Sequence, residues 1–245
     1  MLDFSGMPRT QIAATYITGP FVFYGLYLIL ADQASAWWLL LSFLVIISIS
    51  ISLSVGYHRL FSHRSFECHK LWHWIFALVG SAACQTSGLI WAHGHRQHHR
   101  YADTDNDVYY TNWGIWLGKR FRETEQNLHY VAHLIKDPVH VFTHKYSVLL
   151  ALGIAAAIYL MFGWHALIFG YLLPTGYAQF IMLFLQQFTH SNVTKAPVSR
   201  PYLEFILPIA GEWDHKIHHE NPKKYKFGKF DLGGHFIELI RKKTN

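Results

Sequence analysis

The chain has 245 residues, of which 51% are hydrophobic and 17% aromatic, and its formal net charge is +6. This length and composition fit either one well-packed soluble domain or a small membrane protein, and the distribution of apolar residues decides between them. The aromatic residues scatter through apolar stretches and do not alternate with basic residues. The positive charge therefore indicates attraction to anionic lipid headgroups and excludes nucleic acid as the expected partner.

The first apolar region consists of two uncharged runs, residues 12–30 and 34–55, separated by three residues. Each run has the roughly 20 residues that a helix needs to cross hydrocarbon. A buried helix pair in a soluble protein would normally show a polar face. We therefore predict two membrane spans, over about 12–30 and 36–56.

A second uncharged stretch, residues 147–189, is long enough for two more spans, over 147–162 and 165–189, which fold back at Gly163 and Trp164. The predicted fold class is an all-α membrane protein with four transmembrane helices in two hairpins. The whole chain, 1–245, is interpreted as one domain, in which 57–146 and 190–245 form a helical cap.

The 21 Lys and Arg residues all lie outside the two predicted hairpin tips. This one-sided pattern predicts that both termini and the cap lie in the cytoplasm. Residues 68–91 are apolar enough to suggest a fifth span, but an extra crossing would put the basic segments on opposite sides. We interpret them as one interfacial or re-entrant helix. Cys68 and Cys84 are too few for a disulfide framework.

Eight histidines fall into three tight groups, each just beyond an apolar run: His58 and His63; His95, His98 and His99; His215, His218 and His219. Residues three and four apart share one face of an α-helix, so each HxxHH group can point its rings at one site. His58 and His63 are five apart, which turns the face of an α-helix by about 140°. We therefore predict that this helix ends near Tyr57 or His58 and that His63 comes from the loop.

So many neutral ligands exceed a four-coordinate structural zinc site and suggest two metal ions, for which imidazole permits zinc, copper, iron or nickel. Arginines near the groups could pair with carboxylates that orient the rings: Arg59, Arg64, Arg96 and Arg100 with Asp103, Asp105, Asp107, Glu212, Asp214 or Glu220. Asp105 and Asp107 could instead be ligands. The isolated histidines are interpreted as surface or packing residues: His69, His73, His129, His133, His140, His144, His165 and His235.

The segments HRLFSHRSF (58–66), HRQHH (95–99) and HKIHH (215–219) resemble the three histidine boxes of integral-membrane fatty-acyl desaturases. The first box and WAHGHRQHHRYADTDND are most similar to the stearoyl-CoA (Δ9-type) branch. The resemblance implies two iron ions held by nine histidines, the ninth being His190. It also implies a residue four positions earlier that reaches the metal through water. That residue is Gln186 here, where the Δ9 branch has Asn.

The resemblance further implies an O2-dependent reaction on a fatty-acyl chain carried by CoA, carrier protein or lipid. Two electrons come from an external donor, a ferredoxin or a cytochrome b-type protein. Ile46, Ser50 and Ser54 lie along one face of the second span leading to His58 and are candidates for the substrate tunnel. A helix-packing face of small residues is the equal alternative for these three positions.

Other functions remain open from the sequence. A hydroxylase, acetylenase or alkane-type monooxygenase would use the same diiron scaffold, and product analysis separates it from a desaturase. A histidine-rich metal transporter would place its ligands inside the spans, near the bilayer midplane. The spans of this chain carry no such residues apart from His165, at a tip.

Overall fold

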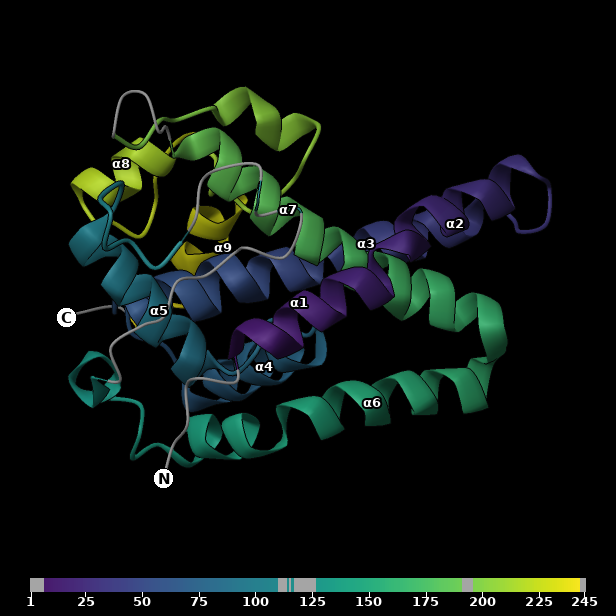
Figure 1. Ribbon diagram of the computed structural model, residues 1–245, viewed down its shortest axis with the longest axis horizontal. Helices are drawn as coiled ribbons and strands as arrows, with labels where there is room; N and C mark the ends of the chain where they lie inside the picture. Colours follow the sequence, from purple (N-terminus) through teal and green to yellow (C-terminus); the bar gives the residue numbers. More distant parts are fainter. Residues whose placement is uncertain (1–6, 110–113, 115, 117–126, 191–195, 243–245) are drawn as a thin grey trace.

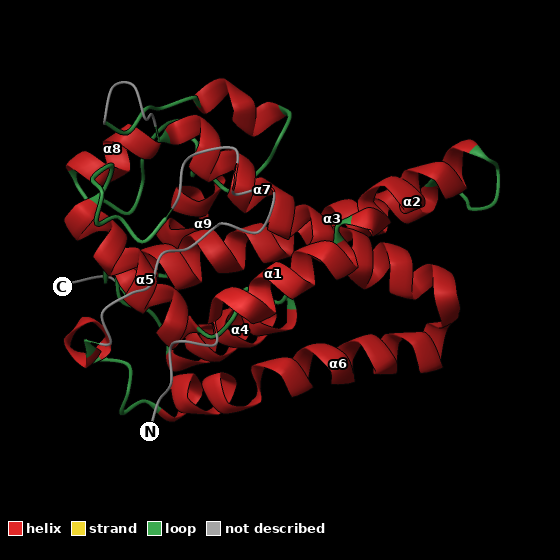
Figure 2. Ribbon diagram, in the orientation of Figure 1, coloured by secondary structure: helices red, strands yellow, loops and turns green. Residues whose placement is uncertain are grey.

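The structure is a computed structural model, and it describes residues 7–109, 114, 116, 127–190 and 196–242. Within these ranges the chain forms helices joined by loops and no strands (Figure 2). The helices are α1 (Met7–Thr18), α2 (Pro20–Leu30), α3 (Trp37–Ile51), η1 (Ser52–Ser62), α4 (Lys70–Ala82), α5 (Gly88–Tyr101), η3 (Leu128–Val131), α6 (Pro138–Leu167), η4 (Ile168–Leu172), α7 (Leu173–Thr189), η5 (Pro201–Phe205), α8 (His215–Glu220) and α9 (Leu232–Ile240).

Three helical stretches in the described ranges are long and apolar enough to cross a membrane: Arg9–Leu30, Trp37–Ser62 and Pro138–Thr189. The third has 52 residues and is interrupted at Gly163, whose φ of 80° lies in the region that favours glycine. Figure 1 shows α6 running to one end of the molecule, where the chain turns and returns through η4 and α7. The helix α6 begins nine residues before position 147, because Asp137 caps it and Pro138 occupies its first turn.

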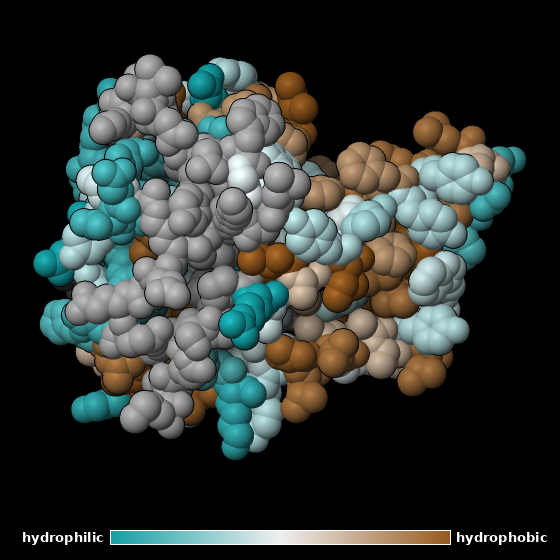
Figure 3. Space-filling model, in the orientation of Figure 1, coloured by the Kyte–Doolittle hydropathy of each residue, from teal (hydrophilic) through white to brown (hydrophobic). Residues whose placement is uncertain are grey.

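Large apolar side chains are exposed along these stretches. Leu30, Trp37 and Leu160 are 87%, 78% and 79% exposed, and they lie near the turns of the apolar helices. In Figure 3 apolar residues dominate the end of the molecule formed by α2, the start of α3 and the end of α6, while hydrophilic residues gather at the opposite end. Water disfavours so much contiguous apolar surface, and lipid removes that penalty. The protein is therefore a membrane protein.

The segment predicted as one interfacial or re-entrant helix is instead two helices, α4 and α5, separated by a turn. The turn forms because Cys84 and Thr86 adopt positive φ angles of 56° and 65°, and because Ser87 caps the N-terminus of α5. Its carbonyl groups accept hydrogen bonds from α7, where Gln179 Nε2 donates to Ala83 O and Cys84 O, both at 3.3 Å. The turn sends α5 back toward the hydrophilic end, where its histidines His95, His98 and His99 lie.

The largest buried apolar cluster surrounds η1 and contains Tyr57, Phe61, Phe76 and Leu89. Glycines let η1 and α4 approach closely, because each glycine leaves room for an aromatic side chain of the other helix. A Cβ atom on Gly80 would lie 2.5 Å from the Tyr57 ring, so only glycine permits this approach. The core therefore fixes the position of the helix that carries His58.

Candidate metal centre

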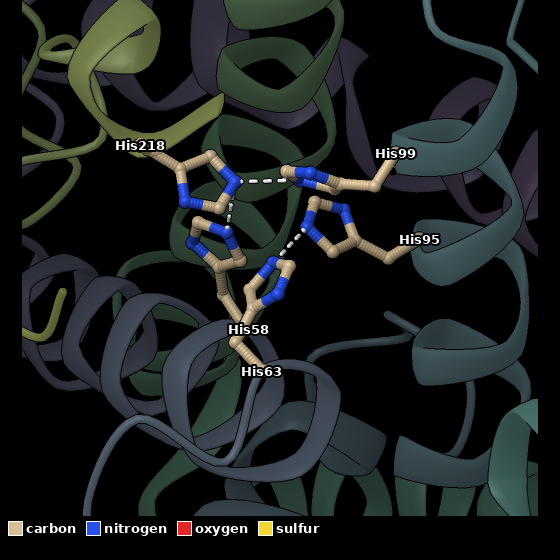
Figure 4. Close-up of side chains that lie close together, drawn as sticks. All are labelled: His58, His63, His95, His99 and His218. Atoms are coloured by element: carbon tan, nitrogen blue, oxygen red, sulfur yellow. Dashed lines mark hydrogen bonds between the residues drawn. The ribbon is translucent and has the colours of Figure 1, made fainter. Parts of the chain in front are cut away.

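The nine histidines singled out in the sequence gather in two groups. The first group contains His58, His63, His95, His99 and His218, and the second contains His98, His190, His215 and His219. Within each group, one ring nitrogen of every histidine lies within 4.8 Å of those of the others. Figure 4 shows the five rings of the first group pointing toward one another.

His58 and His63 reach the same group through a helix type that the sequence analysis did not anticipate. The helix does not end at Tyr57 or His58, and His63 does not come from a separate loop: η1 is a π-helix that continues to Ser62, and His63 caps it. The His63 N–H donates to His58 O at 3.1 Å, a bond between residues five apart. In this wider winding, residues five apart lie on nearly the same side of the helix, and the centroids of the His58 and His63 rings are 5.0 Å apart.

The two HxxHH segments do not each serve one site, as predicted, but divide their ligands between both groups. On α5, His95 and His99 face the first group and His98 faces the second. On α8 the division is reversed, because His215 and His219 face the second group and His218 the first. Residues four apart stay on one face of a helix, whereas adjacent residues diverge by about 100°. Each helix therefore gives two histidines to one group and one histidine to the other.

The nitrogens that meet are the Nε2 atoms. In the first group they are 2.9 Å apart for His58 and His218, 2.8 Å for His63 and His95, and 2.7 Å for His99 and His218. In the second they are 3.1 Å for His98 and His190, 2.7 Å for His190 and His215, and 3.1 Å for His215 and His219. Two imidazole nitrogens bound to one metal ion at about 2.1 Å lie roughly 3.0–3.4 Å apart. These six nearest pairs fit shared metal ions to within a few tenths of an ångström, and the other ligand atoms of each group lie within 4.8 Å of one another.

Carboxylates contact the opposite nitrogen of three of these rings. Glu212 Oε2 lies 2.5 Å from His58 Nδ1, Asp107 Oδ1 lies 2.9 Å from His98 Nδ1, and Asp103 Oδ1 lies 3.2 Å from His190 Nδ1. A carboxylate that accepts the Nδ1 proton fixes the tautomer in which Nε2 carries a lone pair. The sequence left Asp107 as either a metal ligand or a residue that orients a ring. In the structure it contacts His98 Nδ1 and belongs to neither histidine group, as expected of an orienting residue. Asp105, the other possible ligand, is exposed.

The His98 and His190 contact is informative about what the site holds. The Nδ1 atom of each ring contacts a carboxylate, which favours the tautomer with a proton on Nδ1, and in that tautomer two Nε2 lone pairs face each other at 3.1 Å. Two acceptors at this distance repel unless a cation lies between them. A metal ion bound by both rings would supply that cation.

Burial lowers the pKa of several of the site histidines. Burial, followed by the charges of neighbouring histidines, lowers the pKa of His63, His95, His215 and His218 well below the usual 6.5. It lowers the pKa of His99 to about 2. Neutral imidazoles are the form that binds metals, so these five rings need no deprotonation at neutral pH.

A buried ion-pair network supports His58. Burial alone raises the pKa of Glu212, but the charges of His58 and Arg59 outweigh it and lower that pKa. Arg59 is fully buried and its guanidinium lies 3.1 Å from Glu212 Oε1 and 3.0 Å from Asp231 Oδ1. The pair of Arg59 and Glu212 is among the predicted pairings, whereas the pair of Arg59 and Asp231 is not. Arg96 instead donates to the backbone carbonyls of Ser62 and Tyr130.

The remaining predicted site residues lie near the centre or along the second apolar stretch. His190 caps the end of α7, and Gln186 lies one turn earlier, with an Nε2 atom that is buried and has no hydrogen-bond partner in the described residues. Ser50 Oγ donates to Pro208 O at 3.4 Å, and Ser54 Oγ to Glu212 Oε1 at 2.5 Å. Ile46 packs against the apolar cluster of α2, η4 and α7.

Two features of the centre were not predicted as such. From the sequence, the acidic residues were possible arginine partners, with Asp105 and Asp107 as alternative metal ligands. The direct contacts of Glu212, Asp107 and Asp103 with His58, His98 and His190 were not predicted. The sequence analysis also assigned His73 and His140 to packing, although they gather with Asp137 in a third group. The sequence does place Asp137 and His140 three residues apart, a spacing that puts two possible metal ligands on one face of a helix.

Comparison with known proteins gives a consistent set of relatives. No protein-family model matches the chain. The chain is 29% identical over 74% of its length to an sn-2 palmitoyl-lipid 9-desaturase of Nostoc, 31% identical over 72% to acyl-CoA desaturase 1 of Saccharomyces cerevisiae, and 28% identical over 84% to stearoyl-CoA desaturase 5 of Bos taurus. The matched part spans 68%, 38% and 68% of those proteins, respectively. These similarities show that the chain belongs to the fatty-acyl desaturase family, in which it resembles the stearoyl-CoA branch.

Proposed function

We propose that the protein is an O2-dependent diiron desaturase that introduces a double bond into a fatty-acyl chain. The observation that carries the proposal is the convergence of nine histidine Nε2 atoms in two groups, with two lone pairs facing each other between His98 and His190. The names of the relatives support the reaction class, because each is a desaturase of acyl-lipid or acyl-CoA substrates. Two bound iron ions would reduce O2 with two electrons from a donor and remove hydrogen from adjacent methylenes.

In this proposal the protein holds the two iron ions and orients the histidine rings that bind them. His58, His63, His95, His99 and His218 would bind one ion, and His98, His190, His215 and His219 the other. The carboxylates of Glu212, Asp107 and Asp103 keep three rings in the tautomer that presents Nε2. Burial of the rings excludes water from the reacting centre.

The membrane arrangement that we propose has four crossings, with both termini and the metal centre on the cytoplasmic side. The interruption at Gly163 supports two crossings within the third apolar stretch. The one-sided distribution of Lys and Arg supports the orientation. An acyl chain could then enter from the lipid, while a ferredoxin or cytochrome b-type donor approaches the basic cap from the cytoplasm.

The proposed substrate tunnel follows the face of α3 and η1 that carries Ile46, Ser50 and Ser54. Both serine hydroxyls are buried against residues 208–212, the loop that also supplies Glu212. A chain that ends near this loop would therefore lie close to the ring of His58. Gln186 is proposed to reach a metal-bound water through its unpartnered amide.

The proposal is tested by expressing the protein in a host that lacks the activity, together with a competent electron donor. Lipid mass spectrometry then reports the product, and metal analysis of the purified protein reports its iron content. We expect two iron ions per chain and an acyl product lacking two hydrogens. A product that gains one oxygen instead would identify a hydroxylase, and fewer than two irons in fully loaded protein would contradict the proposed centre.

A further inference from the structure

A third group of metal-binding side chains lies outside the nine-histidine centre. It contains His73 from α4 together with Asp137 and His140 at the start of α6, and their nearest ligand atoms all lie within 4.8 Å of one another. The Phe61 ring packs against both histidines of this third group, with centroid distances of 5.8 Å to His73 and 4.4 Å to His140. None of these three side chains has a role in the proposed reaction.

His140 is the unusual member of this group. It is fully buried, and neither of its ring nitrogens has a hydrogen-bond partner in the part of the chain that the structure describes. The Nδ1 atom lies against Gly88, where an added Cβ would be 3.2 Å away. The Nε2 atom faces Asp137, at 4.0 Å from Oδ2. His73 Nδ1 is likewise buried without a hydrogen-bond partner among the described residues.

Buried polar atoms without partners are costly, and a ligand that satisfies them is the simplest reason for their arrangement. We infer that His73, Asp137 and His140 form a binding site for one divalent transition-metal ion of the zinc class, separate from the nine histidines. Two imidazoles and one carboxylate are a ligand set that zinc accepts, with the fourth position open to water.

The geometry requires a small contraction on binding. Ligand atoms bound at about 2.0–2.1 Å in a tetrahedral site lie roughly 3.3 Å apart. The 4.0 Å between His140 Nε2 and Asp137 Oδ2 must therefore shorten, and the partly exposed His73 has room to move toward them. Lys70 Nζ now contacts Asp137 Oδ2 and competes for the same carboxylate oxygen. Its side chain is half exposed and can swing into solvent when the metal ion takes its place.

Such an ion would link α4 to the start of α6, because His73 comes from the first and Asp137 and His140 from the second. Phe61, which contacts both histidines, lies in η1 between His58 and His63. The site would therefore act as a structural clamp that supports the part of η1 between His58 and His63 through the Phe61 ring.

The test uses the full chain in lipid nanodiscs, with its nine-histidine centre loaded with iron during expression. Zinc is added, unbound ions are removed, and zinc and iron per chain are measured by mass spectrometry. We expect the wild-type protein to bind one equivalent of zinc, and His73→Ala and His140→Ala to bind none while keeping their iron. His129→Ala, which changes an exposed histidine, is the matched control and should bind zinc like the wild type.

A second variant probes the competing cation. Lys70→Gln should tighten zinc binding by about two- to fivefold, the factor associated with breaking a half-exposed ion pair. If His140→Ala fails to fold, His73→Ala alone decides, because its side chain is at the edge of the site. Equal zinc content in wild type and His73→Ala, or no zinc in the wild type, would overturn the inference. Iron content and lipid products are read separately, so failure of the proposed function would leave this result interpretable.

Discussion

Replacement of Asp107 by asparagine tests whether carboxylates orient the metal-binding rings. Asp107 is buried, and its two oxygens lie 2.9 and 3.0 Å from His98 Nδ1. The same oxygens accept backbone N–H groups of Asp103 and Tyr109, each at 3.0 Å. Burial alone raises the pKa of Asp107, but the His98 hydrogen bond and these backbone N–H groups lower it, so the side chain is ionised.

Asparagine keeps the shape but has only one accepting oxygen, so its NH2 group must face at least one of these donors. Loss of such a partner typically reduces metal affinity by about 10- to 100-fold, or roughly 1.4–2.7 kcal/mol. We expect this loss in the second histidine group, to which His98 belongs, and not in the first. One of the two bound ions of Asp107→Asn should therefore be removed at a chelator concentration that leaves the wild type loaded.

The assay measures metal per chain against increasing chelator concentration. Asp105→Asn is the matched control, because it makes the same chemical change two residues away at an exposed position. If the two variants released metal at the same chelator concentration, the Asp107 carboxylate would have no orienting role. If Asp107→Asn bound no metal at all in the second group even without chelator, Asp107 would be a ligand rather than a support for His98.

Three further predictions concern the centre and its surroundings. His218→Ala should abolish desaturation and lower the iron content, whereas His129→Ala should do neither; equal losses would mean that the histidines stabilise the fold and do not hold metal. Ser50→Phe should shorten the longest acyl chain accepted, measured by product analysis, and an unchanged product profile at retained activity would remove Ser50 from the tunnel. Acidifying the metal-free protein from pH 7 to 5.5 should destabilise it. The unfolded chain binds protons near pH 6.5 that buried histidines such as His99, with a pKa of about 2, do not. The stability present above pH 6.5 therefore falls by about 1 kcal/mol for each such histidine, which denaturant titration followed by tryptophan fluorescence would detect.

The sequence predicted which side chains gather, because histidines placed just beyond apolar runs are a local pattern. All nine residues predicted as ligands lie in the two groups, including His190, which depended on resemblance rather than on spacing. The α-helical period was also enough to show that His95 and His99 share a face. The identity of the gathered residues is thus visible in the chain itself.

What could not be predicted depends on contacts between distant segments. The π-helical winding of η1 is supported by close packing against α4, where Gly56 and Gly80 admit Phe76 and Tyr57, and nothing local distinguishes it from an ordinary helix end. The partition of each HxxHH segment between two groups requires the relative positions of α5 and α8. The carboxylate partners of His58, His98 and His190 come from loops whose positions the local pattern does not fix.

The division of the α5 and α8 histidines between the two groups also constrains when the centre can form during synthesis of the chain. Both groups include histidines from α8, which follows all three apolar stretches in the sequence. Neither group is therefore complete until residue 219 has left the ribosome, by which time the apolar helices have already been made. A helix of six residues is too short to persist alone, so α8 must wait for its partners. Metal loading of the two proposed sites would thus be complete only after all three apolar stretches have been made.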